Sequence, residues 1–272
     1  MLGISRQAIY QQEQRARKRL TELEKVKNMV QIKRMEMPRL GTRKLYYLLK
    51  ESFELNHIKV GRDSLFNYLR SENMLVKSKK NYTKTTNSKH WLTKHPNIFE
   101  NIVLTRPEQA FVSDITYLKS KENTHYLSLV TDAYSRKIMG YKLSDNMNAE
   151  NVVQALNMAV KERKTTCQLI HHSDRGLQYA SEIYQNKLKT EAILPSMTDG
   201  YDCYQNALAE RVNGILKQEF LFHKCNNLKE LKILVKESIE IYNNKRPHLS
   251  LGMKTPNFIH KKTSEDILTG DK

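Results

Sequence analysis

The first part of the chain carries hydrophobic residues at helical spacing. Between residues 5 and 36, apolar side chains recur every three, four or seven positions, which is typical of one face of an α-helix, and Pro38 ends the pattern. Two shorter amphipathic helices are predicted at 40–52 and 60–75. Two short helices joined by a turn favour a helix-turn-helix unit, with a generic helical hairpin as the alternative.

The pattern changes after a lysine-rich stretch. Residues 77–97 show almost no apolar periodicity, so we expect a basic linker there. After Pro107 come short apolar runs that are typical of strands, alternating with amphipathic helices. The predicted order is strand 110–118, hairpin 125–144, helix 149–163, strand 167–174, helix 180–192, strand 193–198, helix 207–221 and helix 228–243. This order predicts an α/β fold with a mixed five-stranded sheet and helices on both faces, preceded by an all-α helix-turn-helix-like region.

The charge is distributed unevenly. The 272 residues carry a net charge of +17; residues 1–106 hold 23 Lys and Arg against 9 Asp and Glu, and residues 107–272 hold 23 against 20. A surplus of this size suits a polyanion, because each phosphate that is neutralised releases counterions. One alternative is a charge that only keeps the chain in solution. Another is an anionic membrane surface, but the basic segments are not interleaved with Trp or Phe as interfacial helices usually are.

Composition argues against several other classes of protein. No apolar run approaches about 20 residues, so no membrane-spanning helix is expected. The N-terminus lacks the apolar core and cleavage site of a signal peptide. Cys167, Cys203 and Cys225 are odd in number and form no C-x-x-C pair. We therefore expect a reducing cytosol, and neither a disulfide framework nor a cysteine zinc site.

Three carboxylates are candidates for chemistry. Asp114 lies inside the apolar strand "FVSDITYL", where a charge is costly unless it is compensated. Asp174 ends a later strand, in "IHHSDRG", and residues at this end of a strand line the crevice of open α/β sheets. If that strand returns parallel to the first and beside it, Asp114 and Asp174 lie side by side. Glu210 lies on a helix that must pack back over the sheet, so all three acids can converge.

The helix that carries Glu210 has a polar face opposite its apolar stripe. At about 100° per residue, four residues fall within about 60° of Glu210: Asn206, Asn213, Gly214 and Lys217. A solvated face is the ordinary interpretation. The alternative is metal chemistry, because two Mg²⁺ ions about 3.5–4 Å apart can act on both sides of a phosphodiester and need few carboxylates each. Lys217 would then contact a phosphate near the scissile bond.

The spacing of these residues resembles a known pattern. Asp174, Glu210 with 35 residues between the two, and Lys217 resemble the DDE core of bacterial insertion-sequence transposases and retroviral integrases. The segments "SDITYL", "DAYSRKIMGY", "HHSDRGLQYAS", "NALAERVNGILKQEF" and "YNNKRPHLSLGMKTP" resemble second-frame (OrfB-type) transposases of the insertion-sequence-three family. The resemblance covers about residues 40–260. Gln205 departs from it, because relatives often have Asp there, and "LGISRQAIY" is similar to the tail of a helix-turn-helix that begins upstream.

The resemblance implies a ribonuclease-H-like fold and metal-dependent cleavage of DNA at the ends of an insertion sequence, followed by strand transfer. Asp114, Asp174 and Glu210 would be the catalytic acids and would hold two Mg²⁺ or Mn²⁺ ions. The expected partners are double-stranded DNA (terminal inverted repeats and target), other copies of the chain in a homodimer or higher multimer, and an upstream-frame (OrfA-type) protein. The expected location is the bacterial cytoplasm, at the nucleoid, with no membrane partner.

The pattern and the resemblance together predict how the chain is divided. We expect a basic helical arm at 1–37, a helix-turn-helix-like DNA-binding domain at 38–76, a basic linker at 77–106, an integrase-type catalytic core at 107–225, and a C-terminal helix and tail at 226–272.

Several residues outside the three acids are candidate DNA contacts. Arg43 and Arg62 lie in the predicted helix-turn-helix region, where basic side chains position a protein on phosphates. Arg246, in "NKRPHLSLG", could contact DNA or dock the tail of the chain. Trp91 in the basic linker could stack on a base or belong to a small local core.

Other polar side chains are expected to support the site. Asp132 also ends a strand, but it opens a hairpin turn, where Asp is common, so we expect a structural role. His172 is expected to orient the loop of Asp174; without further metal-spaced His or Cys it does not indicate a zinc site. Asn206 is expected either to hydrogen-bond near Glu210 or to begin the helix.

Two other functions remain open. A structure-selective nuclease on the same fold would use the same acids but would only hydrolyse DNA, and the extended basic N-terminal region argues against it. A non-enzymatic DNA-binding regulator would keep the charge but has no reason to keep three converging acids and Lys217. Metal-dependent strand joining would distinguish a transposase from both.

Overall fold

The computed structural model describes residues 5–77, 94–100, 102–199 and 206–269, with 263–269 as backbone only. Trp91, Cys203 and Gln205 lie outside the described residues. The chain forms two compact units, residues 1–78 and 79–272. Among the helices within the described ranges, none has the length and apolar character that crossing a membrane requires.

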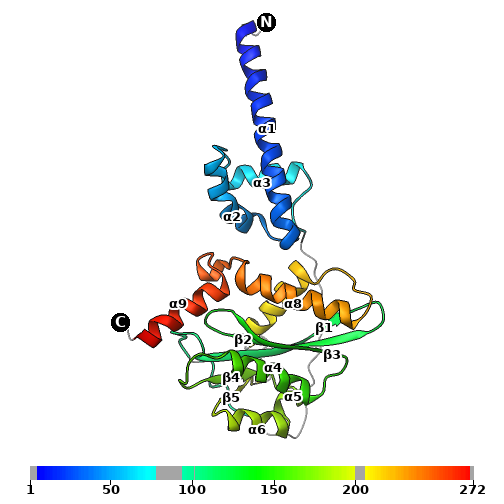
Figure 1. Cartoon of the computed structure of the whole chain (residues 1–272), viewed down its shortest axis with the longest axis vertical. Helices are drawn as coiled ribbons and strands as arrows, with labels where there is room; N and C mark the ends of the chain where they lie inside the picture. The colour runs from blue at the N-terminus through cyan, green and yellow to red at the C-terminus, as the bar shows by residue number, and fades with distance from the viewer. Residues whose placement is uncertain (1–4, 78–93, 101, 200–205, 270–272) are drawn as a thin grey trace. The chain divides into compact units, whose positions relative to one another are not determined.

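The first unit is made of three helices, α1 (Arg6–Glu36), α2 (Thr42–Leu55) and α3 (Arg62–Ser71) (Figure 1). The helices predicted in this region are therefore present. Polar contacts join α1 to the segment around α3: Arg19 donates to the Ser64 hydroxyl at 3.2 Å. The buried residues are Val26 and Val30 of α1 and apolar positions at helical spacing on α2 and α3, including Leu45, Leu49, Leu65 and Leu69. These contacts bury one face of each short helix.

The second unit is built on a five-stranded sheet. Its strands are β1 (Ala110–Lys119), β2 (Thr124–Asp132), β3 (Ile138–Ser144), β4 (Ile170–Ser173) and β5 (Leu194–Met197). They lie in the order β3-β2-β1-β4-β5. The first three strands pair antiparallel, and β4 and β5 join parallel to β1. The mixed sheet and the return of the fourth strand beside the first are confirmed.

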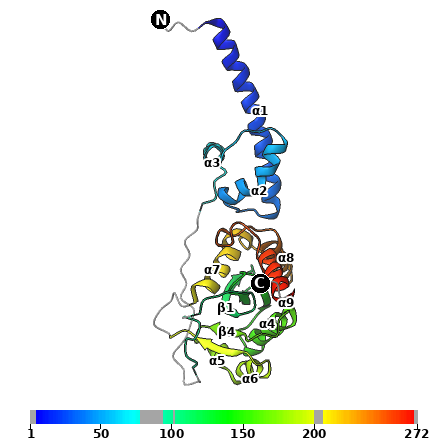
Figure 2. The same ribbon diagram turned by 90° about the vertical axis from the view of Figure 1, so that its left-hand side faces the viewer.

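Helices cover both faces of this sheet (Figures 1 and 2). They are α4 (Ala149–Glu162), α5 (Leu177–Ala180), α6 (Glu182–Thr190), α7 (Ala207–Ile215), α8 (Leu228–Asn244) and α9 (Pro256–Thr269). The helices α4, α5 and α6 pack on one face over a core that contains Phe111, Leu156 and Tyr184. On the other face α7 packs over β1, where Ala209 contacts Ala110 and Val112. The side chain of Asp114 follows Ala110 and Val112 at strand periodicity and so faces α7.

A glycine sets the distance between the sheet and α4. A Cβ atom at Gly140, in β3, would stand 2.1 Å from the Ala155 carbonyl oxygen and 2.7 Å from the Ala159 nitrogen. Both of these atoms belong to the α4 backbone, which cannot rotate away as a side chain can. Only glycine therefore allows β3 and α4 to approach this closely.

Three details of the elements differ from the sequence-based expectation. The helix predicted at 207–221 is α-helical only to Ile215 and continues as a π-helical turn, η2 (Leu216–Phe220). The helix predicted at 180–192 is α6, preceded by the short α5. The tail contains a 3₁₀ turn, η3 (Leu249–Leu251), and α9, which the hydrophobic pattern did not indicate.

Candidate active site

Asp114 sits in the middle of the central strand and is held by two hydrogen bonds. The Asn213 side-chain amide donates to its Oδ2 at 2.8 Å, and the Ile115 backbone N–H donates to its Oδ1 at 2.9 Å. Asp114 is half-buried between β1 and α7. One partner comes from its own strand and the other from α7, so the orientation of this carboxylate depends on how α7 packs.

Asp174 lies beside Asp114 because of the strand register. β1 and β4 are parallel, with Val112 opposite His172; Asp114 and Asp174 each lie two residues beyond that pair. The Gly176 N–H donates to the Asp174 Oδ1 at 3.0 Å. A Cβ atom at Gly176 would also stand 3.0 Å from this oxygen. The turn after β4 therefore fixes the Asp174 carboxylate through a residue that has no side chain.

Glu210 completes the set from the first turn of α7, and the three carboxylates influence one another. Burial, then the charges of Asp174 and Glu210, raise the pKa of Asp114 to about 7, against the hydrogen bond from Asn213. Burial and then Asp174 also raise the pKa of Glu210. These pKa shifts mark a site where negative charge is concentrated in a partly desolvated place.

The site suits a hard divalent cation by its chemistry. Carboxylate oxygens are the ligands that Mg²⁺ prefers, and a cation reverses the repulsion between neighbouring carboxylates. Within the described ranges, no three His, Cys, Asp or Glu side chains are already gathered around one point in a way that would hold an ion. The three carboxylates are thus close enough for their charges to interact, but they are not gathered around one point.

Lys217 lies just after α7, in the π turn η2, and its charge interacts with that of Asp114. It is the second residue of the π turn and is half-buried. Burial lowers the pKa of its ammonium group, while the negative charge of Asp114 opposes that shift. The turn therefore brings a cation within electrostatic reach of the carboxylates.

Two asparagines connect α7 to the strand of Asp114. Asn213 is not among the site residues predicted from the sequence, although it lies three positions after Glu210 on the same polar face; its bond to Asp114 needed the three-dimensional pairing. Asn206 is buried and donates to the Ser113 carbonyl at 3.0 Å, and its side chain does not cap α7. Asn206 thus anchors the start of α7 next to Asp114.

The neighbouring histidines support strands. The His172 Nδ1 is 2.9 Å from the Ser196 hydroxyl of β5, and its ring stacks on Phe99. His171 is buried, and burial lowers its pKa to about 3, followed in effect by His172. Its Nε2 is 2.7 Å from the Ser113 hydroxyl. The predicted contribution of His172 to the loop of Asp174 is therefore indirect, through the packing of β4 against β5.

Arg246 was expected either to contact DNA or to dock the tail of the chain. Its side chain is 2% exposed and makes a bidentate contact with Glu219, at 2.7 and 2.6 Å. The alternative, docking of the tail, is what the structure shows, because a guanidinium enclosed in this way does not face solvent. Arg43 and Arg62, by contrast, are exposed on the first unit, and Arg62 pairs with Asp63 at 2.8 Å.

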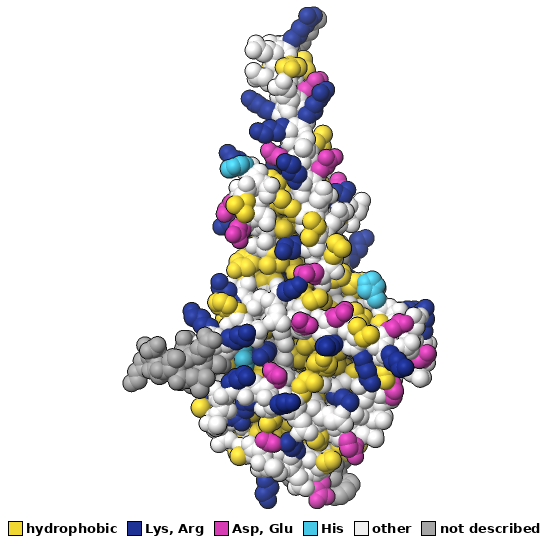
Figure 3. Space-filling view, viewed as in Figure 1, with side chains coloured by type: hydrophobic (Ala, Val, Ile, Leu, Met, Phe, Trp, Pro, Cys, Tyr) yellow, Lys and Arg dark blue, Asp and Glu magenta, His cyan; other side chains and the backbone are white. Residues whose placement is uncertain are grey.

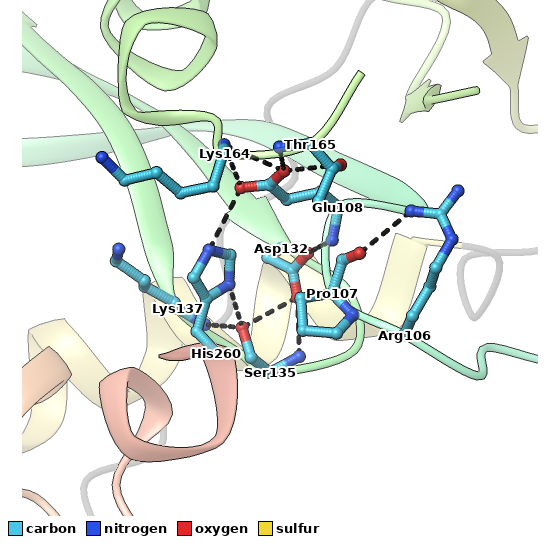
Figure 4. A network of polar contacts seen from close by, with 9 residues as sticks. All are labelled: Arg106, Pro107, Glu108, Asp132, Ser135, Lys137, Lys164, Thr165 and His260. Carbon is cyan, nitrogen blue, oxygen red and sulfur yellow. Dashed lines mark hydrogen bonds and ion pairs between the residues drawn. The ribbon is translucent and has the colours of Figure 1, made fainter. Parts of the chain in front are cut away.

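Asp132 belongs to a separate buried network (Figure 4). Its carboxylate accepts hydrogen bonds from the backbone of Glu108 and Ser135, both at 2.6 Å. The Ser135 hydroxyl is 3.1 Å from the His260 Nδ1, and the His260 Nε2 is 3.3 Å from Glu108. Burial alone would raise the pKa of Glu108, but hydrogen bonds from His260, Lys164 and Thr165 lower it to about 2.

This network holds α9 to the core. Serine, histidine and glutamate follow one another as in a hydrolase triad, but Ser135 is fully buried and cannot reach a substrate. Asp132 is fully buried as well and bonds to the turn that begins there. A structural role for Asp132 is what we expected of an aspartate at a hairpin turn.

Comparisons with known proteins find a known family within the second unit. Two integrase core domain models match residues 105–203 and 191–256. A chain of the simian T-cell lymphotropic virus intasome in complex with PP2A regulatory subunit B56 gamma aligns with a TM-score of 0.50 and 19% identity, covering 81% of this chain and 74% of that one. This similarity concerns the fold, which is ribonuclease-H-like.

Proteins of bacterial insertion elements match at higher identity. The uncharacterized 31 kDa protein of insertion element IS600 from Shigella sonnei is 37% identical over 219 residues, which are 79% of each chain. The transposase for IS629 from Shigella sonnei is 31% identical over 64% of this chain and 58% of its own length. Transposase InsF for IS3A from Escherichia coli (strain K12) is 35% identical over 56% and 53%. The match thus spans little more than half of these two transposases. The chain belongs to the integrase-core transposases of bacterial insertion sequences, in the insertion-sequence-three family.

Proposed function

We propose that the chain cleaves DNA at the ends of its insertion sequence and joins those ends to target DNA, using two divalent metal ions held by Asp114, Asp174 and Glu210. The observation that carries the proposal is the convergence of three acids from β1, the end of β4 and α7, where burial and neighbouring carboxylates, Asp174 above all, raise the pKa values of Asp114 and Glu210. A fold alone would not require three carboxylates at one edge of a sheet.

The metal ions would supply a nucleophile and stabilise the leaving oxygen of a phosphodiester. The residues of the chain have three tasks. Asp114 and Asp174 offer oxygen ligands from adjacent strands, and Glu210 offers one from the helix. Asn213 orients Asp114 by donating to one of its oxygens. Lys217 would hold a phosphate of the DNA in line with the reacting groups.

DNA binding is assigned mainly to the basic N-terminal part. Residues 1–106 hold 23 Lys and Arg against 9 acids, and Figure 3 shows Lys and Arg side chains distributed along α1. Arg43 and Arg62 are exposed on α2 and α3, where they would contact phosphates. The expected ligands are the terminal inverted repeats of the element and the target duplex.

We further propose that the chain works as a homodimer or higher multimer, because one element has two ends to cut and join and each chain carries one set of acids. A further proposed partner is an upstream-frame (OrfA-type) protein. The work would take place in the bacterial cytoplasm, at the nucleoid, where the DNA substrate lies.

We expect strand cleavage and joining to require Mg²⁺ or Mn²⁺. The protein, fused to its upstream frame, is incubated with oligonucleotides of the element ends, with each metal and with EDTA. Loss of both reactions in EDTA and recovery on adding metal are expected. Cleavage that persists in EDTA would contradict the metal mechanism. Hydrolysis without joining would favour the nuclease, and binding without either reaction would favour the regulator.

We expect Gly176→Ala to slow strand joining without unfolding the protein. The new Cβ atom would press on the Asp174 Oδ1, and the backbone at Gly176 has φ −65°, which any residue adopts. Because a misplacement of about 1 Å can cost about 100-fold in rate, a shift of a few tenths of an ångström should cost roughly tenfold. The rate is measured at saturating DNA, with the exposed neighbour Leu177→Ala as the control. A Gly176→Ala rate equal to that of the control would show that this contact does not position Asp174.

A further inference from the structure

The tail of the chain is attached to the π turn that carries Lys217. Arg246, just after α8, donates to both carboxylate oxygens of Glu219, at 2.7 and 2.6 Å. Glu219 lies two residues after Lys217 in η2. The two side chains of this ion pair are 2% and 18% exposed, so the contact is enclosed by protein.

Further contacts fix the guanidinium. The Arg246 Nη1 is 2.9 Å from the His248 Nε2, and its Cζ lies 5.8 Å from the centre of the Tyr242 ring. Tyr242 is fully buried and donates to the Arg136 carbonyl at 3.1 Å. These contacts fix Arg246 in the core. Through Arg246, Glu219 and the π turn η2 are held against the core as well.

The π turn itself is a departure from the helix that precedes it. The Leu221 N–H donates to the Leu216 carbonyl at 2.8 Å, which is the five-residue step of a π-helix. Such turns are uncommon and occur frequently at functional sites. Residues two apart on a helical turn lie on opposite sides: Glu219 bonds to Arg246 of the tail, while the charge of Lys217 interacts with that of Asp114.

We infer that Glu219 and Arg246 are positioning residues, whose buried ion pair holds the π turn in place and thereby keeps the Lys217 ammonium beside the catalytic carboxylates. This inference rests on the proposed function, in which Lys217 holds a DNA phosphate. The inference gives a role to the segment "NKRPHLSLG", which contains none of the three acids: its Arg246 binds Glu219.

The test separates positioning from stability. Removing one partner would leave a buried charge unpaired, whereas replacing both by apolar residues of similar size is often neutral for stability. The test variant is therefore Glu219→Leu with Arg246→Met. The matched control is Lys187→Met with Glu191→Leu, which removes a partly buried ion pair within α6. Four quantities are measured for each variant: melting temperature, DNA affinity, strand-joining rate at saturating DNA, and the rate at which an amine-reactive acetylating reagent modifies Lys217, followed by mass spectrometry.

We expect the test variant to melt and bind DNA like its parent, to join strands about 100-fold more slowly, and to acetylate at Lys217 several-fold faster. The control should match the parent in all four. In a Lys217→Ala background, replacing the ion pair should cause little further loss of rate. A parental joining rate, or unchanged acetylation of Lys217, would overturn the inference.

Two further arms keep the outcomes distinct. If the doubly substituted variant does not fold, Arg246→Lys is tested in its place, because lysine keeps the charge and loses the bidentate contact. We then expect an intermediate joining rate and faster acetylation of Lys217. Parental values of both would refute the inference. If the parent itself joins no strands, the proposed function fails, while the acetylation of Lys217 still decides whether the ion pair holds the π turn.

Discussion

Replacing Asp114 by Asn is expected to abolish strand joining and, at the same time, to raise the melting temperature of the metal-free protein. The new amide keeps the shape of the side chain and one oxygen that can accept from Asn213, and it loses the hydrogen bond from the Ile115 N–H. Against this loss it removes a charge that burial, Asp174 and Glu210 make costly. A metal site contributes several kcal/mol to the transition state, and each factor of ten corresponds to about 1.4 kcal/mol. The rate should therefore fall by about 1,000-fold or more.

The gain in stability should depend on pH with a definite sign. The pKa of Asp114 is raised from 3.8 to about 7 in the folded protein, so folding is penalised once the pH exceeds the unfolded pKa. The penalty is absent below about pH 4, grows with pH, and is complete above about pH 7. At about 1.4 kcal/mol per pKa unit, it amounts to a few kcal/mol at most, because Asp114 is only half-buried.

The measurement compares melting curves of Asp114→Asn and the parent in EDTA between pH 4 and 8, together with strand-joining assays in Mg²⁺. Asp174→Asn and Glu210→Gln should also lose activity. Asp145→Asn, whose side chain is 60% exposed and pairs with His125, should remain active. A variant at Asp114 that joins strands, or that melts below the parent at pH 8 in EDTA, would remove the basis for this choice of acids.

Gly140→Ala should cause a severe loss of stability. Its methyl group would fall within 2.1 Å of the Ala155 carbonyl oxygen, so α4 would have to move away from β3. Overpacking a core usually costs about 1–3 kcal/mol; here the obstacle is backbone, and we expect about 3 kcal/mol or more. The loss in the free energy of unfolding is measured by urea denaturation.

The matched comparison is Gly214→Ala. A Cβ atom there meets nothing within 4 Å, and alanine in a helix is favoured over glycine by about 1 kcal/mol. The two glycine substitutions should thus shift the urea midpoint in opposite directions. A Gly140→Ala midpoint near that of the parent would mean that β3 and α4 separate at little cost.

The strands and two of the acids were accessible from the sequence because they rest on local patterns. Short apolar runs predict β1 to β3, and the position of Asp114 within a buried strand and of Asp174 at the end of another follows from that pattern. Glu210 was placed by the polar face of its helix. Each of these conclusions needs only the periodicity of one element and one assumption about how β4 returns.

The rest depended on contacts between distant residues. The apolar spacing of 207–221 fits an α-helix, and no pattern within this segment indicates the π turn η2. Arginine in a loop normally faces solvent, so the burial of Arg246 follows only from its pairing with Glu219. In the same way, Asn213 gains its role from Asp114, which is distant in sequence. The tail helix α9 was not predicted, because its segment is mostly polar.

The order β3-β2-β1-β4-β5 also has a consequence for the making of the protein. Asp114 is synthesised well before Asp174, and Glu210 later still, so a nascent chain that has folded only its first hairpin holds one of the three acids. Contacts between distant segments form late, because the chain loses the entropy of closing a long loop before these contacts stabilise it. An unfinished chain therefore lacks the complete set of three acids, and the proposed cleavage activity can arise only after Glu210 has been made and α7 has packed on β1.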